Sequence, residues 1–164
     1  MSKNKITKNS SGSVNPKVNL KANPNLIAKP KTLSPKGYKN PSEKLYGQVA
    51  VDEAELERFA NRTLVRRYTI EFECPEFTCL CPRSGFPDFA NIYIRYVPDQ
   101  WCVELKSLKL YINKFRNDKI FHEDVTNRIL EDLVDLLDPW EIEVVGDFNV
   151  RGNIKTVITS EHSK

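Results

Sequence analysis

The chain has 164 residues, with 25 lysines and arginines against 22 acidic residues, and a formal net charge of +3. This length suits one domain with a hydrophobic core of its own, and four cysteines are too few for a disulfide scaffold. No apolar run is long enough to span a membrane, and the N-terminal lysines precede no apolar signal core. We therefore expect a reducing, cytoplasmic location.

Residues 1–45 are predicted to be a disordered tail. Ten lysines and one acid, Glu43, give residues 1–44 a charge of about +9, whereas the remaining fifteen basic and twenty-one acidic residues sum to about −6. The tail is rich in Lys, Asn, Ser and Pro, and cannot bury enough surface to offset the entropy of ordering. Its role is either loose binding to RNA or an acidic surface, or none beyond solvation.

Residues 46–164 are predicted to form the folded domain, and its first half contains two strands. Residues 51–61 suit either a short helical turn or an ordered arm. The alternation of Tyr68, Ile70 and Phe72 with polar neighbours predicts a strand over residues 66–73. A loop bounded by Pro75 and Pro87 follows, and residues 89–97 alternate again as a second strand.

The second half predicts two helices and then two strands. Residues 101–105 are an extended piece or lead directly into the first helix, whose apolar stripe is Leu105, Leu108, Tyr111, Ile112 and Phe115. A second helix over residues 122–138 has four apolar residues on one face, Val125, Ile129, Leu133 and Leu136, and ends before Pro139. Strands are predicted over residues 140–148 and 153–160. The order implies an α+β domain, with two helices on one face of a mostly antiparallel four-stranded sheet.

The stretch FTCLCPRSGFPDF, residues 77–89, allows several interpretations of its cysteines. A zinc site is disfavoured because the cysteine spacings do not match paired knuckles and no histidine is near in sequence. A disulfide between Cys79 and Cys81 would close a tiny ring. Buried free thiols are the ordinary alternative. A fourth interpretation is a catalytic thiol, because a loop through residues 82–87 could bring the Asp88 carboxyl beside Cys81.

A longer set of motifs identifies a family resemblance. FTCLCPRSGFPDF, ELKSLKLYINKFRND, HED and GDFNVRGN together span nearly all of residues 66–158. In order and spacing they resemble the short, single-domain NADPH-dependent 7-cyano-7-deazaguanine reductases, the nitrile reductases of queuosine biosynthesis. The resemblance implies a tunnelling fold whose ββααββ domains assemble side by side into rings, with a decamer expected, and no membrane or direct nucleic-acid substrate.

The resemblance also implies roles for individual residues. Cys81 would be the nucleophile that forms a thioimide with the nitrile, and Asp88 the proton donor. The residues matching the substrate pocket are Val103, Glu104, Leu105, His122 and Glu123. Our own candidates for binding the NADPH phosphates are Lys106, Ser107, Lys109 and Arg151, by virtue of their charge or hydroxyl group. No metal is expected.

Some features depart from the family or favour a rival. Cys79 is a second thiol that could form a redox-sensitive pair with Cys81. A zinc-dependent cyclohydrolase of the same fold is disfavoured because His122 is joined only by His162, which we expect to fray near the C-terminus. An amidine-forming relative would use the same thiol and carboxylate without NADPH. An RNA-binding protein would leave Cys81 and Asp88 unexplained.

Overall fold

The computed structural model describes residues 44–164, so residues 1–43 of the predicted tail lie outside the described residues. The elements, in chain order, are α1 (Tyr46–Asp52), β1 (Arg58–Ala60), β2 (Ile70–Leu80), β3 (Pro87–Val97), β4 (Trp101–Val103), α2 (Leu105–Lys114), the 3-10 turn η1 (Phe115–Asn117), α3 (His122–Leu137), β5 (Glu141–Phe148) and β6 (Val157–Ser163). No helix in this described part is long and apolar enough to cross a membrane.

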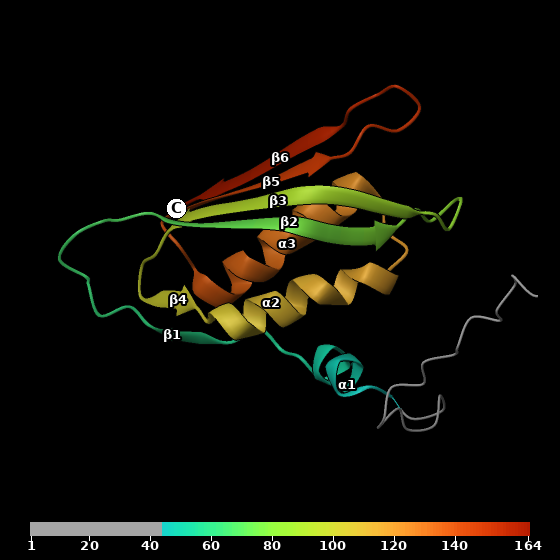
Figure 1. The fold of residues 1–164 in the computed structure, drawn as a ribbon. Helices are drawn as coiled ribbons and strands as arrows, with labels where there is room; N and C mark the ends of the chain where they lie inside the picture. Colours follow the sequence, from blue (N-terminus) through green and yellow to red (C-terminus); the bar gives the residue numbers. More distant parts are fainter. Residues whose placement is uncertain (1–43) are drawn as a thin grey trace, which may run out of the picture. The chain divides into compact units, whose positions relative to one another are not determined.

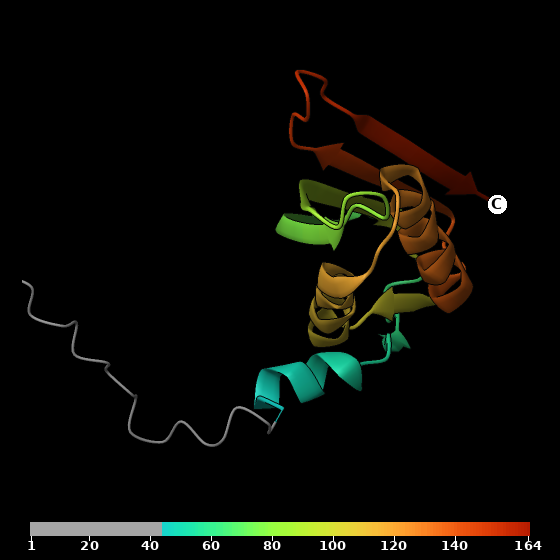
Figure 2. The ribbon, with the colours of Figure 1, turned by 90° about the vertical axis from the view of Figure 1, so that its right-hand side faces the viewer.

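The main sheet is antiparallel, with the spatial order β2-β3-β5-β6, and β1 pairs with β4 in a small second sheet (Figure 1). Figure 2 shows α2 and α3 on the same side of the main sheet. The predicted α+β class and its strand, strand, helix, helix, strand, strand order are confirmed. The sheet has two open edges, β2 and β6, and an unpaired edge can pair with another chain.

The core lies between the sheet and the two helices. The apolar stripe of α3 is buried as predicted at Val125, Ile129 and Leu133, while Leu137 rather than Leu136 completes it. Facing it, every second residue of β3 and β5 is buried, and the residues between them are exposed or partly buried. The largest fully buried side chains include Tyr96, Phe77, Phe115, Phe148, Ile92 and Ile94.

β2 corrects the prediction of a loop after Pro75. The strand continues to Leu80, and a bulge between Cys74 and Phe77 adds one residue to β2 relative to β3. Pro75 is tolerated because β2 is an edge strand, where a missing N–H breaks no second ladder. The bulge changes which positions face the helices: Phe72 and Cys74 face inward before it, and Phe77 and Cys79 after it.

Several other predicted boundaries were wrong. The first strand begins at Ile70 rather than at residue 66, and the last spans Val157–Ser163 rather than residues 153–160, so that His162 is paired in a strand. The segment 51–61 is divided between the end of α1 and β1. Leu105 is 64% exposed rather than part of the buried stripe, because it opens the helix at the mouth of a groove between β2 and α2.

Candidate active site

One cavity of about 350 Å³ collects five of the predicted site residues from four parts of the chain. They are Cys81, Asp88, His122, Glu123 and Arg151. The remaining walls are Pro82, Ser84, Ile120 and Phe121. The volume is at the lower end of the range typical of small-molecule sites. The predicted nucleophile, proton donor and base-binding carboxylate therefore share one small-molecule-sized space.

Cys81 opens the tight loop that joins β2 to β3. Its N–H donates to the carbonyl of Phe86 at 2.9 Å, and its carbonyl accepts from the N–H of Gly85 at 2.8 Å. Gly85 has φ of 72°, a backbone conformation that favours glycine. The Ser84 hydroxyl, followed by the backbone N–H groups of Ser84 and Arg83, lowers the pKa of the Cys81 thiol by hydrogen bonding to its thiolate. Cys81 is thus a partly exposed thiol whose reactive thiolate form is favoured by its neighbours.

The start of α3 is held against the same loop. The segment before the helix forms a parallel bridge with the end of β2: Leu80 donates to the carbonyl of Asp118 at 2.9 Å and accepts from Ile120 at 3.1 Å. α3 begins two residues later, at His122. These two backbone bonds position His122 and Glu123 beside Cys81.

Asp88 is the buried acid of the cavity, with 6% of its surface exposed. Its Oδ1 lies 2.7 Å from Nη2 of Arg151, and its Oδ2 lies 3.3 Å from Nε2 of His122. Across the β2–β3 ladder it stands directly opposite Cys79. Burial, with a smaller contribution from Asp88, raises the pKa of the fully buried Cys79 to about 11, so this second thiol stays protonated near neutral pH.

His122 is fixed by stacking as well as by Asp88. Its ring lies parallel to that of Phe148, with ring centroids 3.8 Å apart and planes 9° apart. A close approach of α3 to β5 accompanies this stacking: a Cβ at Gly146 would lie 2.5 Å from Thr126 Oγ1 and 2.9 Å from Phe148. The absence of a side chain at residue 146 therefore leaves room for the Phe148 platform under His122.

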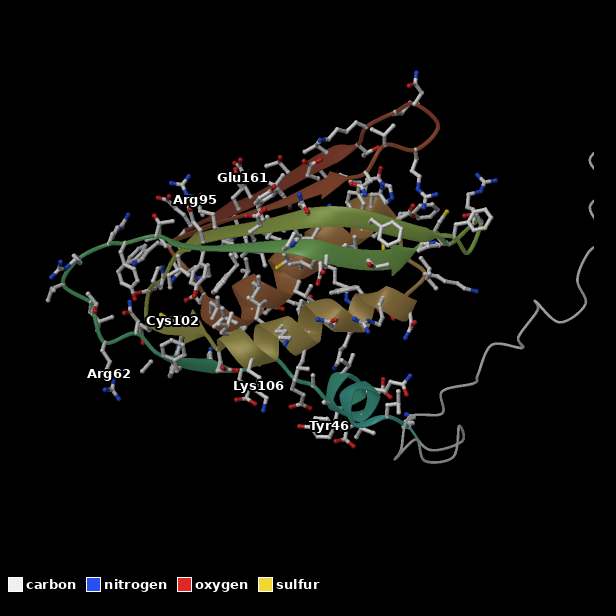
Figure 3. The ribbon with its side chains drawn as sticks, viewed as in Figure 1. Tyr46, Arg62, Arg95, Cys102, Lys106 and Glu161 are labelled. Atoms are coloured by element: carbon white, nitrogen blue, oxygen red, sulfur yellow. The ribbon has the colours of Figure 1, made fainter. Side chains whose placement is uncertain are left out.

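The other six predicted site residues lie around the start of α2 and do not line this cavity. They are Val103, Glu104, Leu105, Lys106, Ser107 and Lys109. Figure 3 shows Lys106 at the end of the helical layer away from the β2–β3 loop. Within one chain, the structure therefore divides the predicted site into two regions.

Most polar groups at the start of α2 already have structural partners. The Glu104 carboxylate caps the helix, accepting from the N–H groups of Lys106 at 2.9 Å and Ser107 at 2.7 Å, and these bonds lower its pKa. The buried Ser107 hydroxyl accepts from the N–H of Glu57 at 3.0 Å and donates to the carbonyl of Glu104 at 2.8 Å. Ser107 therefore braces the segment before β1, which argues against its predicted cofactor role.

Lys106 and Lys109 are exposed and fit a phosphate-bearing ligand better. Both line a groove of about 870 Å³ between α1 and α2, together with Arg116. Clustered cationic side chains are the groups that hold the phosphates of a nucleotide cofactor. The same groove is also lined by four acidic residues, Glu53, Glu55, Glu57 and Glu104, so its cations alone do not identify it as a cofactor site.

Neither metal nor disulfide is part of the described site. Residues 44–164 contain no group of three or more histidine, cysteine or acidic side chains arranged to hold a metal ion. All four cysteines in this part of the chain are free, with Cys79 and Cys102 buried. The suggested oxidation of Cys79 with Cys81 stays a prediction.

Sequence reasoning missed two contributors to the cavity. Ser84 was predicted only as part of the loop through residues 82–87, although its hydroxyl lowers the pKa of Cys81. Phe148 was assigned only to a strand, although it supports the His122 ring. Both lie within the quoted motifs, but nothing in a linear pattern shows that residues 122 and 148 are stacked.

Comparison with known proteins finds a matching family and several similar proteins. The family described as QueF-like protein matches residues 87–164. An NADPH-dependent 7-cyano-7-deazaguanine reductase of Aquifex aeolicus is 59% identical over 116 residues, covering 71% of this chain and 90% of the relative. Its counterpart in Nostoc sp. is 50% identical, covering 80% of this chain and 97% of the relative.

A solved structure supports the fold. The archaeosine synthase QueF-Like in its apo form matches with a TM-score of 0.55 at 17% identity, covering 58% of this chain and 94% of that one. The sequence relatives are far closer, and the match to them extends over nearly their whole length. The chain therefore belongs to the NADPH-dependent 7-cyano-7-deazaguanine reductase family.

Proposed function

We propose that this chain catalyses the reaction of its family, the NADPH-dependent reduction of the nitrile of 7-cyano-7-deazaguanine to an aminomethyl group, in the biosynthesis of the tRNA nucleoside queuosine. The observation that carries the proposal is the cavity that joins Cys81, Asp88 and Glu123. A thiol and a proton-transferring acid are the groups needed to attack a nitrile, and a carboxylate suits the base.

Covalent attachment is the first chemical step of the proposal. The Cys81 thiolate forms a C–S bond to the nitrile carbon, one C–N π bond breaks, and its electron pair takes a proton delivered by Asp88. The product is a thioimide, whose C=N bond is a better hydride acceptor than a nitrile. The low pKa of Cys81 keeps the nucleophile ionised closer to neutral pH.

Bound NADPH supplies two hydrides in succession, one molecule for each reduction. Between the two reductions the C–S bond must break, with its electron pair returning to Cys81. A thiol of lowered pKa leaves faster, so the hydrogen bonds from the Ser84 region serve both attack and release.

Lys106 and Lys109 are our candidates for the cofactor phosphates, because both are exposed cations along one groove.

Recognition of the substrate is assigned to the start of α3. Glu123 is exposed to the cavity, and its carboxylate can accept two hydrogen bonds from the N–H edge of a guanine-like base. The neighbouring His122 has its Nε2 3.3 Å from Oδ2 of Asp88 and lines the same cavity. The base would thereby be oriented with its nitrile toward Cys81.

We further propose that the domains assemble into rings. Two features support this: both outer strands of the main sheet are open, and the start of α2 lies away from the cavity of its own chain. A neighbouring copy could bring the backbone around Val103, Glu104 and Leu105 to the substrate. Light scattering should find a closed homo-oligomer, with ten copies expected; a monomer with full activity would contradict this part.

The first experiment follows NADPH absorbance with 7-cyano-7-deazaguanine for the wild type and for Cys81→Ala. We expect substrate-dependent oxidation that is lost in the variant. Intact mass measured without NADPH should show a substrate adduct on the wild type and none on Cys81→Ala. Cys79→Ala, two residues away, is the matched control and should retain both properties. Absence of oxidation by folded, assembled wild type would contradict the function.

A further inference from the structure

The helix that carries His122 and Glu123 begins without a side-chain cap. Its N-cap residue is Phe121, whose side chain makes no hydrogen bond to the N–H groups of the first turn. A missing cap leaves these groups without a partner from the cap side chain and lowers the stability of the helix end. Glu123 lies in this turn and lines the cavity, so other contacts must fix the position of its backbone.

Two side chains of the second turn of α3 bond back to these site residues. Thr126 Oγ1 donates to the carbonyl of His122 at 2.9 Å, and Asn127 Nδ2 donates to the carbonyl of Glu123 at 2.8 Å. A side chain four residues later lies over the preceding turn, so helix geometry allows both bonds. The bond of Thr126 stays within α3, whereas Asn127 has a further partner outside the helix.

Asn127 links the first turn of α3 to the last strand of the sheet. Its Oδ1 accepts a hydrogen bond from the Ser160 hydroxyl at 2.7 Å. Ser160 lies in β6 directly opposite the buried Val144 of β5, so its side chain is on the face of the sheet that packs against the helices. The hydrogen-bonded series Ser160, Asn127, Glu123 therefore joins the backbone of a cavity residue to the sheet.

Asn113 shows what is particular about Asn127. Asn113 Nδ2 likewise donates to the carbonyl four residues earlier, that of Lys109, at 2.8 Å. Its Oδ1, however, accepts from Arg116, only three residues later in the chain. The two bonds of Asn113 are therefore local, whereas those of Asn127 connect a helix to a strand. A local pair stabilises a helix, but a bond between two layers also fixes where the helix lies.

We propose that Asn127 is a positioning residue, which together with Ser160 holds the backbone of Glu123 so that its carboxylate meets the base of the substrate. This inference rests on the proposed function, in which Glu123 accepts hydrogen bonds from the N–H edge of the base. Fixing the backbone of Glu123 before the substrate arrives reduces the conformational freedom that binding must remove, and thereby strengthens binding.

The test measures the affinity for 7-cyano-7-deazaguanine by calorimetry in a Cys81→Ala background, where no covalent adduct forms. Asn127→Ala should weaken binding about two- to tenfold, the change that corresponds to one net hydrogen bond. Asn127→Asp keeps the shape and can still accept from Ser160, but it cannot donate to the Glu123 carbonyl, so it should weaken binding as well. Ser160→Ala should cause a smaller loss.

Two matched controls should keep the affinity for the substrate. Asn113→Ala removes a side-chain amide with the same bond to its own helix, and Thr159→Ala changes the neighbour of Ser160 on the opposite face of β6. With Cys81 present, Asn127→Ala should leave the KM for NADPH within about twofold of the wild type, because its contacts are with Glu123 and Ser160.

A double variant separates positioning from a general effect on stability. In a Glu123→Ala background, Asn127→Ala should weaken substrate binding little further, because both changes remove the same contact to the base. Additive losses would overturn the inference, as would unchanged affinity in Asn127→Ala or an equal loss in Asn113→Ala. A wild type that binds the substrate through Glu123 but does not oxidise NADPH would overturn the proposed reduction alone. Absence of substrate binding would overturn both.

Discussion

The cavity beside the β2–β3 loop and the start of α2 both contain residues of the family motifs, but their polar side chains have different kinds of hydrogen-bond partners. In the cavity, Asp88 bonds across the fold to Arg151 and His122, which lie on different elements. At the start of α2, Glu104 and Ser107 bond mainly to their own helix turn and to the segment before β1. Long-range partners position groups for chemistry, whereas local partners stabilise the helix end.

This difference shows how a motif can combine two functions. A motif such as ELKSLKLY contains residues that build the helix start and residues that remain free, and only the structure separates them. Lys106 and Lys109 remain exposed, whereas Ser107 is buried. Variants in the cavity should therefore affect the chemical step, whereas variants at the start of α2 should affect cofactor binding or stability.

The largest effect is expected for Asp88→Asn. The amide keeps the size of the side chain but cannot carry the proton, so kcat should fall about 10²- to 10⁴-fold. Substrate affinity should change little, because Glu123 and the rest of the cavity are intact. Stopped-flow rates and substrate titration measure the two quantities. Normal turnover would remove Asp88 from the site.

The paired change Lys106→Ala and Lys109→Ala should act on binding. Removing two charge-assisted contacts should raise the KM for NADPH about tenfold or more, with kcat nearly unchanged. The matched control is Lys119→Ala, an exposed cation of the segment between η1 and α3 that does not line the groove. A loss of kcat without a change in KM would place the start of α2 in the chemistry and break the comparison.

Alkylation should distinguish the two partly exposed thiols. Hydrogen bonds lower the pKa of Cys81, whereas burial raises the pKa of Cys74. Because the thiolate is the reactive form, Cys81 should react with iodoacetamide at a lower pH than Cys74. Ser84→Ala should shift the Cys81 profile to higher pH. Peptide mass mapping across a pH series checks this, and coincident profiles would contradict it.

The smallest effect is expected for Glu104→Ala. Losing the cap should lower the melting temperature by a few degrees while leaving the cavity chemistry in place. Since the capping bonds lower the pKa of Glu104, its contribution is present above the ordinary glutamate range and is lost as pH falls through the lowered value. The melting difference should therefore vanish in acid. A difference that persisted there would require another cause.

The sequence was sufficient for the elements with clear periods and for the local neighbours of Cys81. The stripe of α3 and the alternation of β3 were readable because helices and strands repeat every 3.6 and 2 residues. The 77–89 motif placed Cys81 near Asp88 because only six residues separate them. Both are short-range properties of the chain.

Other features depend on contacts that no local pattern contains. Arg151 pairs with Asp88, which lies more than sixty residues earlier in the sequence, and its charge alone did not predict this contact. β2 continues past Pro75 because it is an edge strand, and edge position is a property of the assembled sheet. The division of the predicted site into two regions likewise follows from where α2 begins relative to the β2–β3 loop.

The bulge between Cys74 and Phe77 affects on which side of the sheet Cys81, the proposed nucleophile, lies. Successive side chains of a strand point to opposite faces of the sheet, so the one extra residue exchanges the two faces for the rest of β2. Cys79 therefore points inward, and Cys81 follows just after the end of the strand. Deleting a single residue at the bulge would turn Phe77, Cys79 and Cys81 toward the opposite face of the sheet. The sequence would still contain every side chain of the cavity. The position of Cys81 therefore depends partly on the number of residues in β2, the strand that precedes it.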